Sequence, residues 1–164
     1  ILLKGVQTWE DAVQAYEMGL AGVVLSNHGG RQLDFARSGV EVLEEVMREL
    51  RKRGSFPNPA FQVMVDGGFR RGTDILKAIA MGATAVGIGR PFLYAYSAYG
   101  VDGVIHAINL LRDELEMNMR LIGARSIEEL VPGMVDLSAL HNHTGAVFPK
   151  QDQSVLDFMD KSRL

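Results

Sequence analysis

The sequence contains no cysteine, so neither disulfide bonds nor thiolate metal sites are available to it. No apolar run approaches the length of about 20 residues that a membrane-spanning helix needs, and a membrane span is not expected. The sequence also lacks a large excess of either charge, because 17 basic and 20 acidic side chains leave a formal net charge of −3. A slightly acidic chain without basic blocks gives no electrostatic basis for binding nucleic acid or an anionic membrane.

The overall composition is typical of a folded α/β protein. Of the 164 residues, 47% are hydrophobic and 23% are charged, and the 18 glycines cluster after apolar segments. The chain starts with Ile1–Gly5, a pattern that resembles the second half of a buried strand. Because a domain rarely begins inside a strand, we expect residue 1 to lie within a longer chain.

Short apolar segments alternate four times with amphipathic segments. Strands are predicted over 1–4, 22–25, 61–65 and 84–88, and helices over 8–19, 38–50, 73–81, 101–122 and 126–130. Ser38 and Glu41 form a capping-box signature at the start of the second helix. The opposite face of that helix carries Glu44, Glu45, Arg48 and Arg51, which we expect to be solvated. Such alternation predicts a parallel sheet covered by helices.

Two architectures fit this pattern, a doubly wound open sheet and a (β/α)8 barrel. The Gly-x-Gly-x-x-Gly turn of dinucleotide-binding open sheets is absent. Each predicted strand is followed by a chemically active residue, namely Lys4, His28, Asp66 and Arg90. Chemistry spread over successive strand ends favours the barrel, which needs eight strands and about 250 residues. Residues 1–140 therefore predict the C-terminal half of a TIM barrel with four βα units.

The loop Ser26–Asp34 directly follows the second predicted strand and is the strongest candidate for an active site. The imidazole of His28 suits proton abstraction near neutral pH. The guanidinium of Arg31 suits a substrate carboxylate. Gly29 and Gly30 let the backbone turn sharply and let a flat ligand approach. The alternative interpretation is a structural histidine that caps a strand.

The last two strand ends resemble a phosphate site. Asp66-Gly67-Gly68 with Arg70, and Gly89-Arg90, combine free backbone N–H groups with arginines at neighbouring loops. Loops after the last two strands of barrels commonly hold a phosphate. The alternative is a pair of tight turns with surface arginines. Lys4 at the first strand end either stabilises negative charge on a bound cofactor ring or reaches solvent.

We expect an irregular tail over 141–164. His141 and His143 flank Asn142 without acidic neighbours at ligand spacing, and no metal site is predicted. The final residues Ser162-Arg163-Leu164 are a conservative variant of the peroxisomal Ser-Lys-Leu address, so we expect a peroxisomal protein. A mitochondrial or cytoplasmic location is the alternative.

Four motifs occur together in one order: Lys4-Gly5, Ser26–Asp34, Asp66–Asp74 and Gly89–Pro91. In this order and spacing the sequence resembles the FMN-dependent 2-hydroxy acid oxidases and dehydrogenases, among them glycolate oxidase and the cytochrome-linked L-lactate dehydrogenases. The resemblance extends from residue 1 to about residue 140 and corresponds to the C-terminal half of the family's barrel.

The resemblance implies a role for each motif residue. Lys4 would lie near flavin N1 and the C2 carbonyl, and Ser26 would help to hold the flavin. His28 would be the base, and Arg31 would bind the substrate carboxylate. Asp66 would contact the ribityl chain, while Gly68, Arg70, Gly89 and Arg90 would hold the FMN phosphate. The implied cofactor contacts also include His28, Gly29, Arg31 and Gly67.

The resemblance also implies an activity, the oxidation of an L-2-hydroxy acid to the 2-oxo acid, with oxygen or a cytochrome as electron acceptor and a homotetrameric full-length enzyme. The family's N-terminal half supplies further substrate and flavin contacts, so we expect this chain alone to be inactive. Unpaired sheet edges also favour aggregation. Two alternatives remain: another FMN- or phosphate-binding barrel such as a flavin-dependent isomerase, and a non-catalytic half-barrel that acts as an assembly partner.

Overall fold

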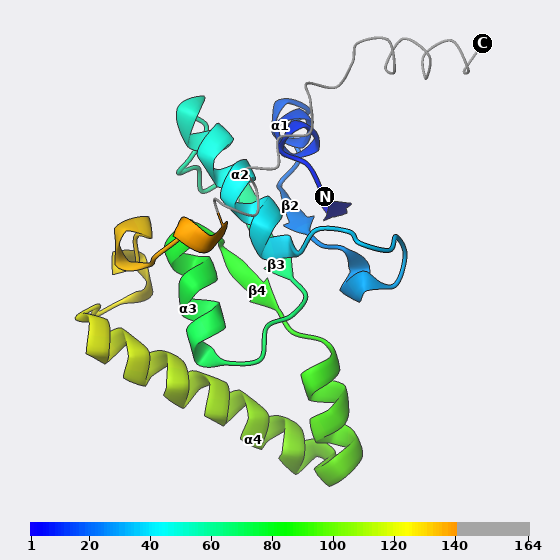
Figure 1. Ribbon diagram of the computed structural model, residues 1–164, viewed down its shortest axis with the longest axis vertical. Helices are drawn as coiled ribbons and strands as arrows, with labels where there is room; N and C mark the ends of the chain where they lie inside the picture. The colour runs from blue at the N-terminus through cyan, green and yellow to red at the C-terminus, as the bar shows by residue number, and fades with distance from the viewer. Residues whose placement is uncertain (141–164) are drawn as a thin grey trace.

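A computed structural model describes residues 1–140 of the protein (Figure 1). The elements are β1 (Leu2–Val6), α1 (Trp9–Glu17), β2 (Gly22–Leu25), the 3-10 turn η1 (His28–Gly30), α2 (Gly39–Lys52), β3 (Gln62–Asp66), α3 (Gly72–Met81), β4 (Ala85–Gly87), α4 (Arg90–Ile122) and the 3-10 turns η2 (Ile127–Glu129) and η3 (Pro132–Met134). The predicted tail, with His141 and His143, lies outside the described residues.

The four strands form one parallel sheet in the order β1-β2-β3-β4. A helix follows each strand, and α1, α2 and α3 pack against the strands beside them. Parallel neighbours joined by helical crossovers place all four strand ends at one edge of the sheet. The prediction of four βα units is therefore confirmed.

The hydrophobic core lies between one face of the sheet and the helices. Val23, Leu25, Val63 and Val65 are fully buried there. They pack in one cluster with the apolar stripe of α2. The alternate residues Val24 and Met64 are only partly buried, and Gln62 is exposed. Because side chains alternate along a strand, the helices cover one face and the other stays open.

Strand β1 contains a bulge. Lys4 is paired with Val24 and Val6 with Leu25. The chain therefore advances by two residues in β1 where it advances by one in β2. The extra residue is Gly5, whose φ of 94° lies in the left-handed region. A bulge of this kind is favoured by glycine because other residues are strained there. Val6 is thereby buried in the core, while Lys4 remains exposed.

Helix α2 begins as predicted, but its outer face differs from the prediction. The Ser38 Oγ accepts a hydrogen bond from Glu41 N at 3.3 Å, and Ser38 N donates to Glu41 Oε2 at 2.7 Å, which completes the capping box. Arg51 Nη2 donates to the carbonyl oxygen of Met81 at 2.6 Å. Partial burial lowers the pKa of Arg51, although the residue remains exposed. The prediction of a fully solvated face was wrong at Glu44 and Glu45, whose side chains are 7% and 12% exposed.

Helix α4 begins at Arg90, earlier than the predicted start at Val101. It is broken at Tyr99 and Gly100, where Gly100 has a φ of 60° and a ψ of −145°. Figure 1 shows the two arms meeting at a sharp angle, with the second arm running past α3. Pro91 in the first turn fixes a helical φ, so the Gly-Arg-Pro segment starts a helix rather than a loop.

Candidate active site

A cavity of about 440 Å³ lies at the C-terminal ends of the strands. Its lining comes from the C-terminal parts of three strands, from the segments that follow β2, β3 and β4, and from the start of α4: Lys4, His28, Gly29, Arg31, Asp66, Gly67, Gly68, Phe69, Arg70, Gly87, Ile88, Gly89, Arg90, Pro91 and Leu93. Of the residues predicted for the site, only Ser26 is absent from this lining, and it is buried beneath Lys4. The sheet topology thus brings together residues that lie far apart in the sequence.

Lys4 connects three strand ends at the floor of the cavity. Its Nζ donates to Ser26 Oγ at 3.0 Å and lies 3.4 Å from Asp66 Oδ2. The second carboxylate oxygen, Asp66 Oδ1, is buried and has no hydrogen-bond partner. A buried oxygen without a donor is costly. The floor therefore holds a paired cation and one acceptor that a ligand hydroxyl can satisfy.

His28 occupies the first position of the η1 turn with a φ of 56°, which is unusual for a residue with a side chain. Its backbone N–H donates to Ser26 Oγ at 3.1 Å, so Ser26 binds both Lys4 and the His28 backbone. The side chains of His28 and Arg31 are exposed at the cavity rim. This placement leaves an imidazole and a guanidinium accessible to a small molecule.

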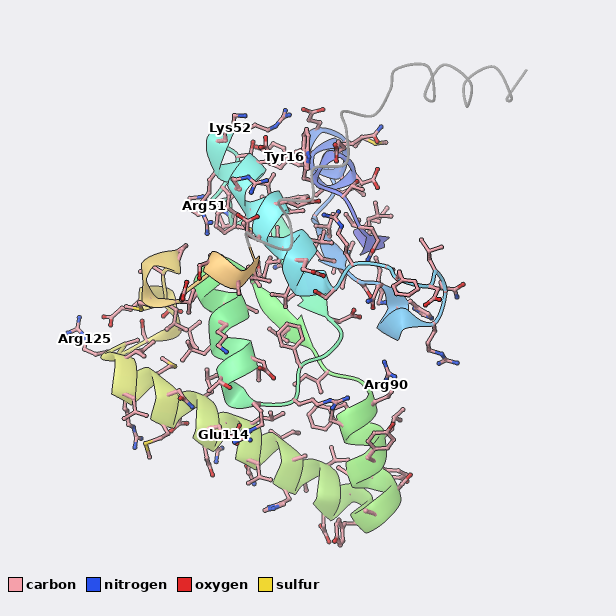
Figure 2. The ribbon with its side chains drawn as sticks, viewed as in Figure 1. Tyr16, Arg51, Lys52, Arg90, Glu114 and Arg125 are labelled. Carbon is pink, nitrogen blue, oxygen red and sulfur yellow. The ribbon has the colours of Figure 1, made fainter. Side chains whose placement is uncertain are left out.

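The other end of the cavity is formed by the loops after β3 and β4. Gly67 and Gly68 have φ values of 90° and 87°, conformations that favour glycine. Arg90, at the start of α4, donates from Nη2 to the carbonyl oxygen of Gly29 at 2.8 Å. Figure 2 shows this arginine between α4 and the loop that follows β2. The helix N-terminus and the arginines Arg70 and Arg90 together favour an anion.

The loop after β3 is fixed by two carboxylates. Asp74 Oδ2 accepts from the backbone N–H groups of Arg70 and Arg71, both at 3.0 Å. Glu114, labelled on α4 in Figure 2, accepts from Arg71 Nε at 2.8 Å and from Gly72 N at 2.8 Å. The Arg71 hydrogen bond lowers the pKa of Glu114, and Glu114 in turn raises the pKa of Arg71. These bonds hold Arg70 at the cavity.

Sequence reasoning missed several residues that line the cavity, notably Phe69, Ile88 and Leu93. They are apolar, and no pattern in the sequence distinguishes them from core residues. Phe69 is in fact mostly buried within the core cluster. The aromatic side chains Tyr94, Tyr96 and Tyr99 are exposed on the first arm of α4.

Residues 1–140 contain no group of three or more metal-ligating side chains that could hold a metal ion. Over the same range, no helix combines the length and the apolar character needed to cross a bilayer.

Comparison with known proteins connects this cavity to a family. Residues 1–137 match the sequence profile of the FMN-dependent dehydrogenases. The chain belongs to the FMN-dependent dehydrogenase family. The resemblance stated from the four motifs is therefore confirmed, and FMN is the cofactor of the family.

Two curated relatives illustrate the range of this family. The chain is 59% identical over 142 residues to an L-lactate dehydrogenase (cytochrome) from Wickerhamomyces anomalus, covering 87% of this chain and 24% of that protein. It is 48% identical over 130 residues to a peroxisomal (S)-2-hydroxyacid oxidase from Arabidopsis thaliana, covering 79% of this chain and 34% of that protein. The chain thus spans about a quarter to a third of the length of these relatives.

Solved structures of the FMN-dependent dehydrogenase family confirm the fold. The flavin-binding domain of flavocytochrome b2 from baker's yeast is 54% identical and superposes with a TM-score of 0.83, covering 96% of this chain and 39% of that domain. A mandelate oxidase is 43% identical with a TM-score of 0.72 over 80% of this chain. Flavocytochrome b2 is a TIM-barrel flavoenzyme, so the four βα units correspond to part of a (β/α)8 barrel.

The residues present fit an FMN group on the evidence of this structure alone. The unpartnered Asp66 Oδ1 requires a hydroxyl donor, which a ribityl chain carries. A Cβ atom added at Gly29 would lie 3.0 Å from Arg90 Nη2, so glycine at this position leaves room for the Arg90 guanidinium beside the loop that follows β2. Lys4 and the two arginines supply positive charge at opposite ends of the cavity.

Proposed function

We propose that the complete protein carrying this chain is an FMN-dependent oxidoreductase that oxidises an L-2-hydroxy acid of the lactate or glycolate type to the 2-oxo acid. One observation carries the proposal: a single cavity gathers Lys4, His28, Arg31 and Asp66 from three strand ends, with Arg70 and Arg90 at its other side. A base, a carboxylate-binding cation and a phosphate-binding end are the groups that this reaction needs.

His28 is the base in this proposal. Oxidation removes two electrons and two protons from the hydroxy acid, and the imidazole accepts one of those protons, from either the carbon or the hydroxyl. FMN, when bound, would take up the two electrons and the second proton. Arg31 binds the substrate carboxylate, because a guanidinium can donate two parallel hydrogen bonds to it. The three-residue spacing of His28 and Arg31 keeps both groups on the same small substrate.

The cofactor contacts follow from the floor and the far end of the cavity. Lys4, already held by Ser26, places its ammonium where negative charge on a reduced ring would be stabilised. Asp66 accepts from the ribityl chain. The phosphate is held by Gly68 and Gly89 with Arg70 and Arg90. Gly29, Gly67 and the backbone around His28 and Arg31 complete the cofactor contacts.

We propose a cytochrome as the electron acceptor, with oxygen as the alternative. The greater identity to the cytochrome-linked lactate dehydrogenase, 59% against 48% for the oxidase, supports a cytochrome over oxygen as the acceptor.

A homotetramer remains our prediction for the complete protein. Peroxisomal location is likewise a proposal, supported by the name of the Arabidopsis relative, with the mitochondrion and cytoplasm as alternatives. The terminal residues 162–164 lie outside the described residues.

The function is tested by anaerobic flavin spectroscopy. We expect the complete protein with FMN to lose its oxidised-flavin absorbance when L-lactate or glycolate is added, and the D-enantiomer of lactate to leave it unchanged. The 164-residue chain with added FMN is expected to show no such bleaching, because it spans only part of the barrel. A complete protein that binds FMN but is not bleached by any L-2-hydroxy acid would contradict the proposed activity.

The phosphate end of the cavity gives a separate prediction. We expect Arg70→Gln to weaken FMN binding at least about tenfold, because one charge-assisted hydrogen bond contributes roughly 1.5–3 kcal/mol. The measurement is FMN affinity by fluorescence titration of the complete apoprotein. Arg112→Gln is the matched control, since Arg112 is an exposed arginine on α4 outside the cavity. Equal FMN affinities of the two variants would remove Arg70 from the phosphate site.

A further inference from the structure

The catalytic loop is held in a conformation that its own sequence disfavours. His28, Gly29 and Gly30 have consecutive φ values of 56°, 69° and 71°. Gly29 and Gly30 adopt this region freely, whereas a residue with a β-carbon such as His28 is strained there. Some surrounding contact must therefore select the turn that sends the His28 side chain to the cavity.

The side chain of Asn27 makes that contact on both of its polar atoms. Its Oδ1 accepts from Gly30 N at 3.1 Å, and its own backbone oxygen accepts from the same N–H at 3.1 Å. Its Nδ2 donates to the carbonyl oxygen of Arg37 at 3.3 Å. The carboxamide thus closes the His28–Gly30 turn on one side and ties it to the far end of the same loop on the other.

Arg37 is itself fixed to two secondary-structure elements. Its guanidinium donates to both carboxylate oxygens of Glu45 on α2, at 2.7 and 2.9 Å, and to the carbonyl oxygen of Gln7 after β1 at 2.7 Å. The Glu45 carboxylate is only 12% exposed, so this pair is more rigid than a surface ion pair. A chain of hydrogen bonds therefore runs from the helix and strand framework through Arg37 and Asn27 to the His28 turn.

We propose that Asn27 is a positioning residue that holds His28 at the distance needed for proton transfer, with Arg37 and Glu45 as its support. This inference rests on the proposed function, because it requires His28 to be the base. Asn27 touches neither substrate nor cofactor in this proposal; it acts only through the turn. Proton transfer depends steeply on placement, and a displacement of about 1 Å can lower a rate on the order of a hundredfold.

The test compares three variants of the complete FMN-loaded protein. Asn27→Ala removes both side-chain bonds. Asn27→Ser retains a hydroxyl that can accept from Gly30 N but cannot reach Arg37. Asn58→Ala is the matched control, because Asn58 Oδ1 accepts from Ala60 N at 2.9 Å in a similar turn before β3, away from the cavity. The readout is the rate of flavin reduction by L-lactate per bound FMN in a single anaerobic turnover, which a loss of stability alone does not change.

We expect the rate of flavin reduction in Asn27→Ala to be lower by a factor of about ten or more. Asn27→Ser should recover part of that loss, and Asn58→Ala should match the unsubstituted protein. All three are expected to bind FMN equally. An Asn27→Ala rate equal to that of Asn58→Ala overturns the inference. If Asn27→Ala does not fold, unchanged rates in both Asn27→Ser and Glu45→Gln overturn it instead. Absence of flavin reduction in the unsubstituted protein identifies a failure of the proposed function, and the inference fails with it.

Discussion

Replacing His28 with alanine is expected to lower the turnover of L-2-hydroxy acids at least about a hundredfold in the complete protein, since a positioned base contributes roughly 10²- to 10⁴-fold. The imidazole is exposed at the cavity rim, and no other histidine lines the cavity among the described residues. Alanine at position 28 cannot accept the substrate proton. The rate of anaerobic flavin bleaching by L-lactate measures this loss directly.

His106→Ala is the control for this prediction, because His106 is an exposed histidine on α4 outside the cavity. Its variant is expected to bleach at the rate of the unsubstituted protein. The FMN content of the His28 variant should stay high, since the phosphate end of the cavity is formed by other loops. Comparable bleaching rates for the two variants would exclude His28 as the base.

The second large effect concerns stability. We expect Gly39→Ala to lower the free energy of unfolding by about 2–3 kcal/mol, at the upper end of overpacking effects. Gly39 is the first residue of α2 and is buried against the strand ends. A Cβ atom there would lie 2.7 Å from the carbonyl oxygen of Asp66 and 3.0 Å from that of Leu25. Because these are backbone atoms, the helix must move away from β2 and β3.

Denaturant unfolding of the complete protein measures the loss, and FMN affinity measures its effect on the site. Displacing α2 disturbs the end of β3, so FMN binding by the Gly39 variant should also weaken. Gly133→Ala is the control, because a Cβ atom at Gly133 meets nothing within 4 Å and its backbone has no left-handed φ. Identical unfolding midpoints for the two variants would show that α2 can shift without cost.

The gathering of the candidate site residues in one cavity was predictable, because they are residue types that are unusual at strand ends. Lys4 and Asp66 lie within apolar strands and His28 directly after one, and parallel topology makes such positions neighbours. The strands themselves were predictable from short apolar segments bounded by glycine. The four motifs in one order then specified the family, which the comparisons confirmed over residues 1–137.

Features that depend on contacts between distant segments were not predictable. The hydrogen bond from Arg51 Nη2 to the carbonyl oxygen of Met81 joins residues 30 positions apart, and the helical pattern around Arg51 does not indicate it. The first arm of α4 was missed because glycine and proline at residues 89 and 91 are typical of a turn. The link from Asn27 to Arg37 depends on a loop path that carries no periodic pattern.

The glycine bulge in β1 also decides which way its two neighbours face. Lys4 belongs to the cavity and Val6 to the core, although residues two apart in a regular strand share one face. If the bulge were replaced by a regular strand over these three residues, either the cation would turn into the core or the valine would turn out of it. A side chain at position 5 is strained at the φ of 94° that the bulge requires. Relatives with a lysine in the cavity and an apolar core residue two positions later should therefore keep glycine between them.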